Sequence, residues 1–336
     1  MPSAGDVEVK RHVGALTARA ADNLFWLGRY LERAEATVRL IRAGHSRAAL
    51  RDRGERAVAL AISDLLADRS AIAADKPLLM RKIALAALTS SRLIGSGAGV
   101  VGSARRAASG VRERFSIDVV SAIDELVEAL DPAVRPRADP QERADRALRL
   151  LAAISGLVGE NMAQLTGWRF LEMGRRIERA LNTADFIVAL GLEGATSASL
   201  QALLELGDSS ITYAQRYFVA AAQRPVIDLL LLDDNNPRSC AFQIRKLHEL
   251  VQQMPGEAAD ETASLARRLA ERLSAETIAA DAASVDRAFV ERINIGLLGL
   301  SGRDLRALFG QSAIGSPIPS GSTNDLRYSP RHLVDL

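Results

Sequence analysis

Residues 28–34 read Gly-Arg-Tyr-Leu-Glu-Arg-Ala, and residues 174–180 read Gly-Arg-Arg-Ile-Glu-Arg-Ala. The two stretches lie 146 residues apart in a chain of 336 residues. Aligning residues 27–41 with residues 173–187 gives seven identities in fifteen positions, where average residue usage would give about one. Such a match indicates that a helical unit occurs twice. We therefore expect the chain to consist of two related halves.

Both stretches have the apolar spacing of a helix that packs along one stripe. Apolar residues from Leu24 to Ile41, and again from Phe170 to Ile187, recur at alternating intervals of three and four, which is the period of an α-helix. Hydrophobic residues make up 48% of the chain and charged residues 25%, an ordinary balance for a globular protein. The expected fold class is all-α, as a pseudo-twofold duplicated helical array with two long Glu-Arg motif helices.

Proline and glycine suggest where the chain divides. The stretch from Asp131 to Pro140 contains three prolines and cannot continue a helix, whereas the end of the chain is rich in Gly, Ser and Pro and loses its apolar period. The predicted parts, in chain order, are an N-terminal extension (1–16), a first helical half (17–130), a linker (131–140), a second helical half (141–309) and a flexible tail (310–336).

Three local predictions concern helix boundaries. Thr17 is expected to cap the long helix that carries the first motif. The stretch 200–232 is expected to be helical throughout. Asn236 is expected to cap a further helix that has Pro237 at its first position and ends near Met254.

The charge and cysteine content point away from several classes of protein. The formal net charge is only +2 and charges of both signs are interspersed, so we expect neither a nucleic-acid nor a membrane partner. No long apolar run or signal-peptide pattern is present, and a single cysteine, Cys240, excludes an internal disulfide, which favours a cytoplasmic protein. The four histidines are scattered without metal-ligand spacing, so neither a metal nor a cofactor is expected.

The charged residues of the motif lie on the side of the helix opposite the apolar stripe. A Glu and the Arg that follows it diverge around a helix, so Glu32 is expected to pair with Arg29 or with another helix. Three interpretations remain: a solvated surface pair, a buried network joining the halves, or a recognition site for a carboxylate or phosphate. Phe25 and Trp26 share this side, which favours burial. The candidate polar site comprises Arg29, Glu32, Arg33, Arg175, Glu178, Arg179 and Arg238.

Three stretches together resemble the alpha-E family, a group of bacterial all-helical proteins with a Glu-Arg motif: residues 20–35, residues 167–180 and the Leu-Asp-Asp-Asn-Asn-Pro-Arg-Ser run at 232–239. The resemblance extends from about Ala15 to Leu300. It implies a helical fold, a cytosolic setting, and work beside a circularly permuted ATP-grasp ligase, often with a transglutaminase-like protein. Such systems are proposed to make or modify peptides through amide bonds.

Two functions follow from these observations. The leading one is a non-catalytic helical accessory protein that binds a partner ligase, a peptide substrate, or both. The alternative is an enzyme in which the Glu-Arg pairs perform acid-base chemistry on a substrate that bears a carboxylate or phosphate. No nucleophile, metal or phosphate-loop motif favours the enzyme. Arg238 is expected near Arg175, Glu178 or Arg179, beside a helix start whose free N–H groups would meet an anion.

Overall fold

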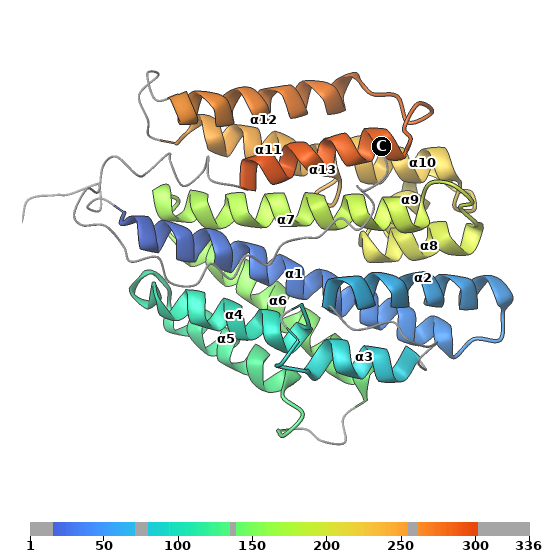
Figure 1. Cartoon of the computed structure of the whole chain (residues 1–336), viewed down its shortest axis with the longest axis horizontal. Helices are drawn as coiled ribbons and strands as arrows, with labels where there is room; N and C mark the ends of the chain where they lie inside the picture. Colours follow the sequence, from blue (N-terminus) through green and yellow to red (C-terminus); the bar gives the residue numbers. More distant parts are fainter. Residues whose placement is uncertain (1–15, 71–79, 94, 135–138, 255–260, 302–336) are drawn as a thin grey trace, which may run out of the picture.

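The structure, a computed structural model, describes residues 16–70, 80–93, 95–134, 139–254 and 261–301. Every regular element in this part of the chain is a helix (Figure 1), which confirms the all-α prediction. No helix among these residues is long and apolar enough to cross a membrane. Apart from Leu16, the expected N-terminal extension (1–16) and tail (310–336) lie outside the described residues.

The longest helix, α1 (Ala18–Ala48), begins where the sequence predicts. The Thr17 hydroxyl accepts a hydrogen bond from the backbone N–H of Ala20 at 3.2 Å, which satisfies one of the donors that a helix start leaves free. The apolar stripe of α1 is buried, and so are Arg29 and Glu32 on its other side. Two sides of α1 are therefore packed, and the helix runs through the middle of the molecule (Figure 1).

The second motif helix, α7 (Thr166–Leu190), lies directly against α1. A Cβ atom on Gly28 would overlap the carbonyl oxygen of Leu171, and one on Gly174 would overlap the carbonyl oxygen of Phe25. The two backbones thus come closer than any residue with a side chain allows. This explains why glycine opens both copies of the motif.

The two motif helices run in the same direction. Leu24 lies beside Gly167 near their beginnings, and Glu32 lies beside Arg179 further along. Residues that match in the two motifs therefore lie at the same height along the pair.

The remaining helices form a group around each motif helix. Around α1 lie α2 (Arg53–Ser70), α3 (Met80–Thr89), α4 (Gly97–Ser109) and α6 (Pro140–Asn161), with α5 (Ile117–Leu130) packed on α4 and α6 and preceded by a 3-10 turn (Arg112–Arg114). Around α7 lie α8 (Ser197–Leu206), α11 (Cys240–Gln252) and α13 (Arg287–Ser301), with α12 (Glu261–Ala279) packed on α11 and α13.

Five helices of the first group contact one another in the same pattern as five helices of the second group. The pairs are α1 and α7, α2 and α8, α4 and α11, α5 and α12, and α6 and α13. Each pair begins within a few residues of the 146-residue offset of the motif. The duplication itself stays a prediction. Figure 1 shows α4 and α5 on one side of the central pair and α11 and α12 on the other.

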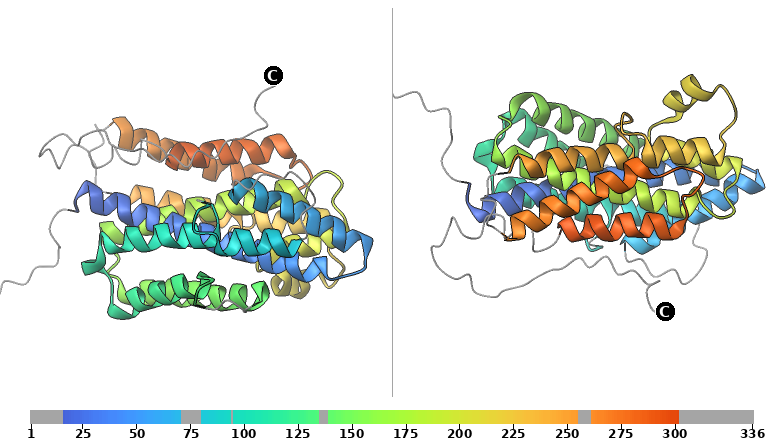
Figure 2. Two further views of the ribbon diagram at one scale, coloured as in Figure 1. Left: turned by 60° about the horizontal axis from the view of Figure 1, so that its bottom comes forward. Right: turned by 90° about the horizontal axis from the view of Figure 1, so that it is seen from above.

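The prediction of continuous helix over 200–232 is wrong. The chain forms α8, α9 (Ser210–Tyr217), α10 (Gln223–Ile227) and a π-helical turn (Asp228–Leu232). Asp208 and Phe218 interrupt it with left-handed backbone at φ 50° and 51°, a conformation that costs free energy for residues other than glycine. Only Tyr213 of α9 is buried, and α9 lies at the edge of the body (Figure 2, right).

The proline-rich segment joins two helices that pack on each other. α5 ends at Leu130, and α6 begins at Pro140 with the Asp139 side chain as its cap. Arg143 of α6 donates hydrogen bonds at 3.1 Å to the carbonyl oxygens of Ala129 and Asp131. Residues 135–138 lie outside the described part, and the division of the chain at 131–140 stays a prediction.

Candidate functional site

The Glu of each motif pairs with two Arg of the other motif, and these two Arg stand at matching positions in the two motifs. Glu178 accepts hydrogen bonds from Arg29 Nε at 2.5 Å and from Arg33 Nε and Nη2 at 2.8 and 3.1 Å. Glu32 accepts from Arg175 Nε at 3.2 Å and from Arg179 Nε and Nη2 at 2.8 and 2.6 Å. Of the two pairings expected for Glu32, the structure shows the one that crosses to another helix.

These two sets of ion pairs, which α1 and α7 exchange with each other, are buried. Glu32 and Glu178 are each only 4% exposed, so the solvated surface pair is wrong. Burial by itself would raise the pKa of Glu178, but the charges and hydrogen bonds of Arg29 and Arg33 outweigh it and lower the pKa to about 2. Glu178 is therefore ionised at neutral pH, and both of its oxygens are occupied. A general base works best with a pKa near the working pH, and Glu178 is far from that range.

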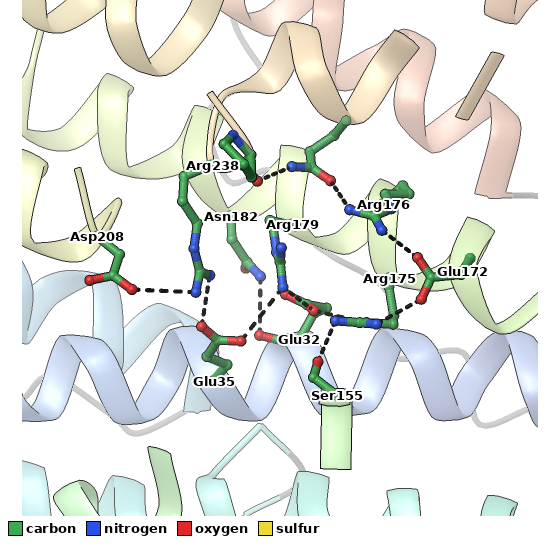
Figure 3. Close-up of polar contacts among 12 residues, drawn as sticks. Glu32, Glu35, Ser155, Glu172, Arg175, Arg176, Arg179, Asn182, Asp208 and Arg238 are labelled. Carbon is green, nitrogen blue, oxygen red and sulfur yellow. Dashed lines mark hydrogen bonds and ion pairs between the residues drawn. The ribbon is translucent and has the colours of Figure 1, made fainter. Parts of the chain in front are cut away.

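A serine hydroxyl extends each side of the exchange. Arg29 Nη1 donates to Ser301 Oγ of α13. Arg175 Nη2 donates to Ser155 Oγ of α6 at 2.5 Å (Figure 3). Ser155 and Ser301 are themselves 146 residues apart. The correspondence between the two groups of helices therefore reaches individual polar side chains outside the motif, which the sequence analysis did not detect.

Arg29 and Arg175 stand at matching positions of the two motifs, but the side chains around them differ in chemistry. Trp26 and Tyr30 stack at 5.7 Å between ring centroids, and the Arg29 guanidinium lies 5.6 Å from the centroid of Trp26, a distance that allows a cation–π interaction. At the matching positions of α7 stand Glu172 and Arg176. One side of the exchange is thus aromatic and the other ionic.

Glu172 is a site residue that the sequence analysis missed. It is 3% exposed and accepts from Arg175 Nη1 at 2.6 Å and from Arg176 Nη2 at 2.5 Å. Burial would raise the pKa of Glu172, but the two arginines lower it below its usual range. Its spacing of three and four residues before two arginines is the signal that could have found it.

Glu35 connects Arg238 to the motif. It accepts from Arg39 Nε at 2.9 Å. It also accepts from Arg238 Nη1 at 2.7 Å, and its other oxygen lies 3.8 Å from Arg179 Nη2 (Figure 3). Burial would raise the pKa of Glu35, but Arg238, Arg179 and Arg39 together lower it well below its usual range. The structure therefore places Arg238 one carboxylate away from Arg179. Glu35 was not among the residues selected from the sequence.

Asp208 closes the network at the surface. Its Oδ2 accepts from Arg39 Nη2 at 3.0 Å and from Arg238 Nη2 at 3.5 Å. The Asp208 side chain is 58% exposed, whereas those of Arg39 and Arg238 are 10% and 25% exposed. Nothing in the sequence around Asp208 indicated this contact, because it depends on the break between α8 and α9.

The predicted helix start at Asn236 is wrong. α11 begins at Cys240, and its cap is Ser239, whose hydroxyl accepts from the N–H of Phe242 at 3.0 Å. The buried Asn236 amide instead donates to Ser209 Oγ at 3.1 Å and to the carbonyl oxygen of Leu229 at 2.8 Å. Its Oδ1 accepts from the N–H of Arg238 at 3.2 Å, so the side chain closes a local turn, but no helix begins there.

The anion site expected beside Arg238 stays a prediction. The guanidinium of Arg238 points to Glu35 and Asp208, and the first turn of α11 is already capped by Ser239. Cys240 is buried, which raises the pKa of its thiol and makes it unreactive. Among the described residues, no group of three or more His, Cys, Asp or Glu side chains could hold a metal ion.

Comparison with known proteins gives a family. A family model named Alpha-E, a predicted alpha-helical domain with a conserved ER motif, matches residues 16–303. Uncharacterized proteins of Mycobacterium bovis and Mycobacterium tuberculosis are 26% identical over 272 residues, which cover 71% of this chain and 30% of each relative. The chain therefore spans about a third of the length of these relatives. No solved structure matches it.

Proposed function

Because the chain belongs to the Alpha-E family, we propose that it is a non-catalytic accessory protein that binds a partner enzyme, the partner's peptide substrate, or both. The proposed partner is a circularly permuted ATP-grasp ligase that forms amide bonds, with a transglutaminase-like protein as a second partner. The proposed setting is the cytosol, which fits a chain whose only cysteine is a buried thiol.

The observation that carries this proposal is the complete pairing of the motif carboxylates. Both oxygens of Glu32 and of Glu178 accept hydrogen bonds from arginines across the central pair of helices. A carboxylate that acts as a general acid or base must exchange a proton with substrate, and these two already have charged partners. The motif thus serves as a structural centre, and binding falls to the outer residues of the network. This favours the accessory protein over the enzyme.

In the mycobacterial relatives, the matched region makes up 30% of a longer polypeptide. The same proposal takes the two groups of helices as the product of a duplication.

Co-purification tests the proposal directly. The tagged full-length chain is mixed at micromolar concentration with an ATP-grasp ligase from the same genome, with and without nucleotide and peptide. We expect the two proteins to co-elute in at least one condition, and an unrelated helical protein of similar charge to elute separately. Separate elution in every condition would contradict the partner-binding part of the proposal.

A further inference from the structure

We propose that Arg39 and Arg238 form a binding site for a carboxylate, and that the side chain of Asp208 is its internal occupant. The ligand class is a peptide that bears a free carboxylate, at its C-terminus or on an acidic side chain. This inference rests on the proposed peptide-binding function and names the chemical group that the network would receive.

The first support is the convergence of two guanidinium groups on one oxygen. Arg39 comes from α1 and Arg238 from the turn before α11, yet both donate to Asp208 Oδ2, at 3.0 and 3.5 Å. Each also donates to Glu35 Oε1, at 2.9 and 2.7 Å. Glu35 therefore holds the two guanidinium groups in place, and each offers a further N–H toward the same point. Arginine is well suited to bind carboxylates because its N–H groups lie in a rigid fork.

The second support is the distribution of exposure. The side chains of Glu35 and Arg39 are 14% and 10% exposed, whereas the carboxylate of Asp208 faces solvent. Exposed ion pairs contribute little to stability, about 0 to 1 kcal/mol. An external carboxylate could therefore displace Asp208 without disturbing the buried part of the network.

The third support is the charge balance of the connected network. In the described residues its ion pairs link five arginines to four carboxylates, and Asp208 is one of the four. The arginines are Arg39, Arg175, Arg176, Arg179 and Arg238, and the other carboxylates are Glu32, Glu35 and Glu172.

The surroundings of Arg238 show the same excess of positive charge. Burial lowers the pKa of Arg238, and the positive charges of Arg179 and Arg39 lower it further, against the attraction of Glu35. Displacing Asp208 would leave five arginines with three carboxylates. The site then attracts an anion in its place.

Calorimetric titration of the full chain tests the proposal with two probes. N-acetyl-alanyl-alanine presents a C-terminal carboxylate, and N-acetyl-glutamate α-amide presents a side-chain carboxylate. We expect Asp208→Asn to bind at least one of them tenfold or more tightly than the unaltered chain, because its amide carries no negative charge. The C-terminal amide of the first probe should show no gain. The probe that gains identifies the source of the carboxylate.

Two further variants make the result specific. Arg238→Ala added to Asp208→Asn should abolish the gain. Asp281→Asn removes another exposed carboxylate, one paired with Arg224 at 3.1 Å, and should leave binding unchanged. Equal affinity in Asp208→Asn and the unaltered chain, persistence of the gain without Arg238, or the same gain in Asp281→Asn would each overturn the proposal.

Folding and partner binding are read separately. A melting temperature within a few degrees of the unaltered chain shows that Asp208→Asn is folded, and Asp208→Gly, which suits the positive φ, is the substitute if it is not. Co-elution with the ligase needs no free carboxylate probe. If the ligase binds and the probes do not, the carboxylate site falls while the proposed function stands. If the probes bind and no ligase does, the proposed function falls while the carboxylate site stands.

Discussion

The helices around α1 and those around α7 agree at their centre and differ at their edge. At the centre, glycine, arginine, glutamate and serine occur at matching positions and make matching contacts. At the edge, α2 is one helix of 18 residues, whereas its counterpart breaks into α8 and α9 around Asp208. The shared centre therefore joins the two groups, and the feature that suggests a ligand lies where they differ.

The largest expected effect comes from breaking the central exchange. Glu178→Ala removes the buried carboxylate that Arg29 and Arg33 share, and we expect a loss of about 3–5 kcal/mol in the free energy of unfolding. Glu32→Ala should cost a similar amount, because its surroundings match. Urea denaturation measures both. Glu249→Ala, which removes a partly exposed acid paired within its own helix, should change little. A large loss of stability in only one of the two motif variants would show that the two glutamates do not contribute equally to the centre.

The second expected effect is a loss of stability in acid. The pKa of Glu178 is about 2 in the folded protein, against 4.5 for an unperturbed Glu. Because the folded-state pKa is lowered, its contribution is complete above pH 4.5 and is lost as the pH falls toward 2. It amounts to about 3 kcal/mol. Unfolding free energies measured across this range should fall for the unaltered chain. The fall should be shallower in Glu178→Gln, and an equal slope would contradict the assignment.

A third effect concerns the contact between the central backbones. Gly28→Ala and Gly174→Ala each place a Cβ atom on a carbonyl oxygen of the facing helix, and we expect each to cost about 1–3 kcal/mol. Gly156→Ala and Gly159→Ala are matched controls in α6 with open space around the added atom. These controls should stabilise the fold by about 0.5–1 kcal/mol. Thermal melts of the four variants compare them, and tolerance at Gly28 or Gly174 would refute the close approach.

The smallest expected effect lies at the edge, after α9. Phe218 is 85% exposed and has a φ of 51°, so Phe218→Gly loses almost no packing and relieves a strained backbone. We expect a gain of about 1 kcal/mol in the free energy of unfolding. Chemical denaturation detects it, with Ile211→Gly as the contrasting variant. Ile211 is also exposed but lies within α9, so glycine there should destabilise the helix.

The sequence predicts the centre of the fold better than its edge. The apolar spacing and the offset between the motifs predict α1, α7 and the burial of their charged side, since Phe25 and Trp26 share it. They do not decide between pairing within a helix and pairing across helices, because both use the same residue types. The partner of an arginine such as Arg238 depends on tertiary contacts, and these come from Glu35 on α1 and from Asp208.

The errors have local causes. Asn236 has the right chemistry for a helix cap, yet its amide is used between two segments that the sequence does not place together. The break at Asp208 could have been expected from residues 207–210, which read Gly-Asp-Ser-Ser and favour a turn. Glu172 could have been selected from its spacing to Arg175 and Arg176 alone.

The exchange of charges across the central pair has a consequence for any shortened form of this chain. A fragment with only the helices α1 to α6 would carry Glu32, Arg29 and Arg33 but none of the partners that they have in α7. Its motif is nevertheless complementary to itself, because the glutamate of one copy could take the two arginines of another. Such a fragment would gain its counter-charges by associating as a symmetric dimer, which gives a single motif the same centre that the full chain builds from two.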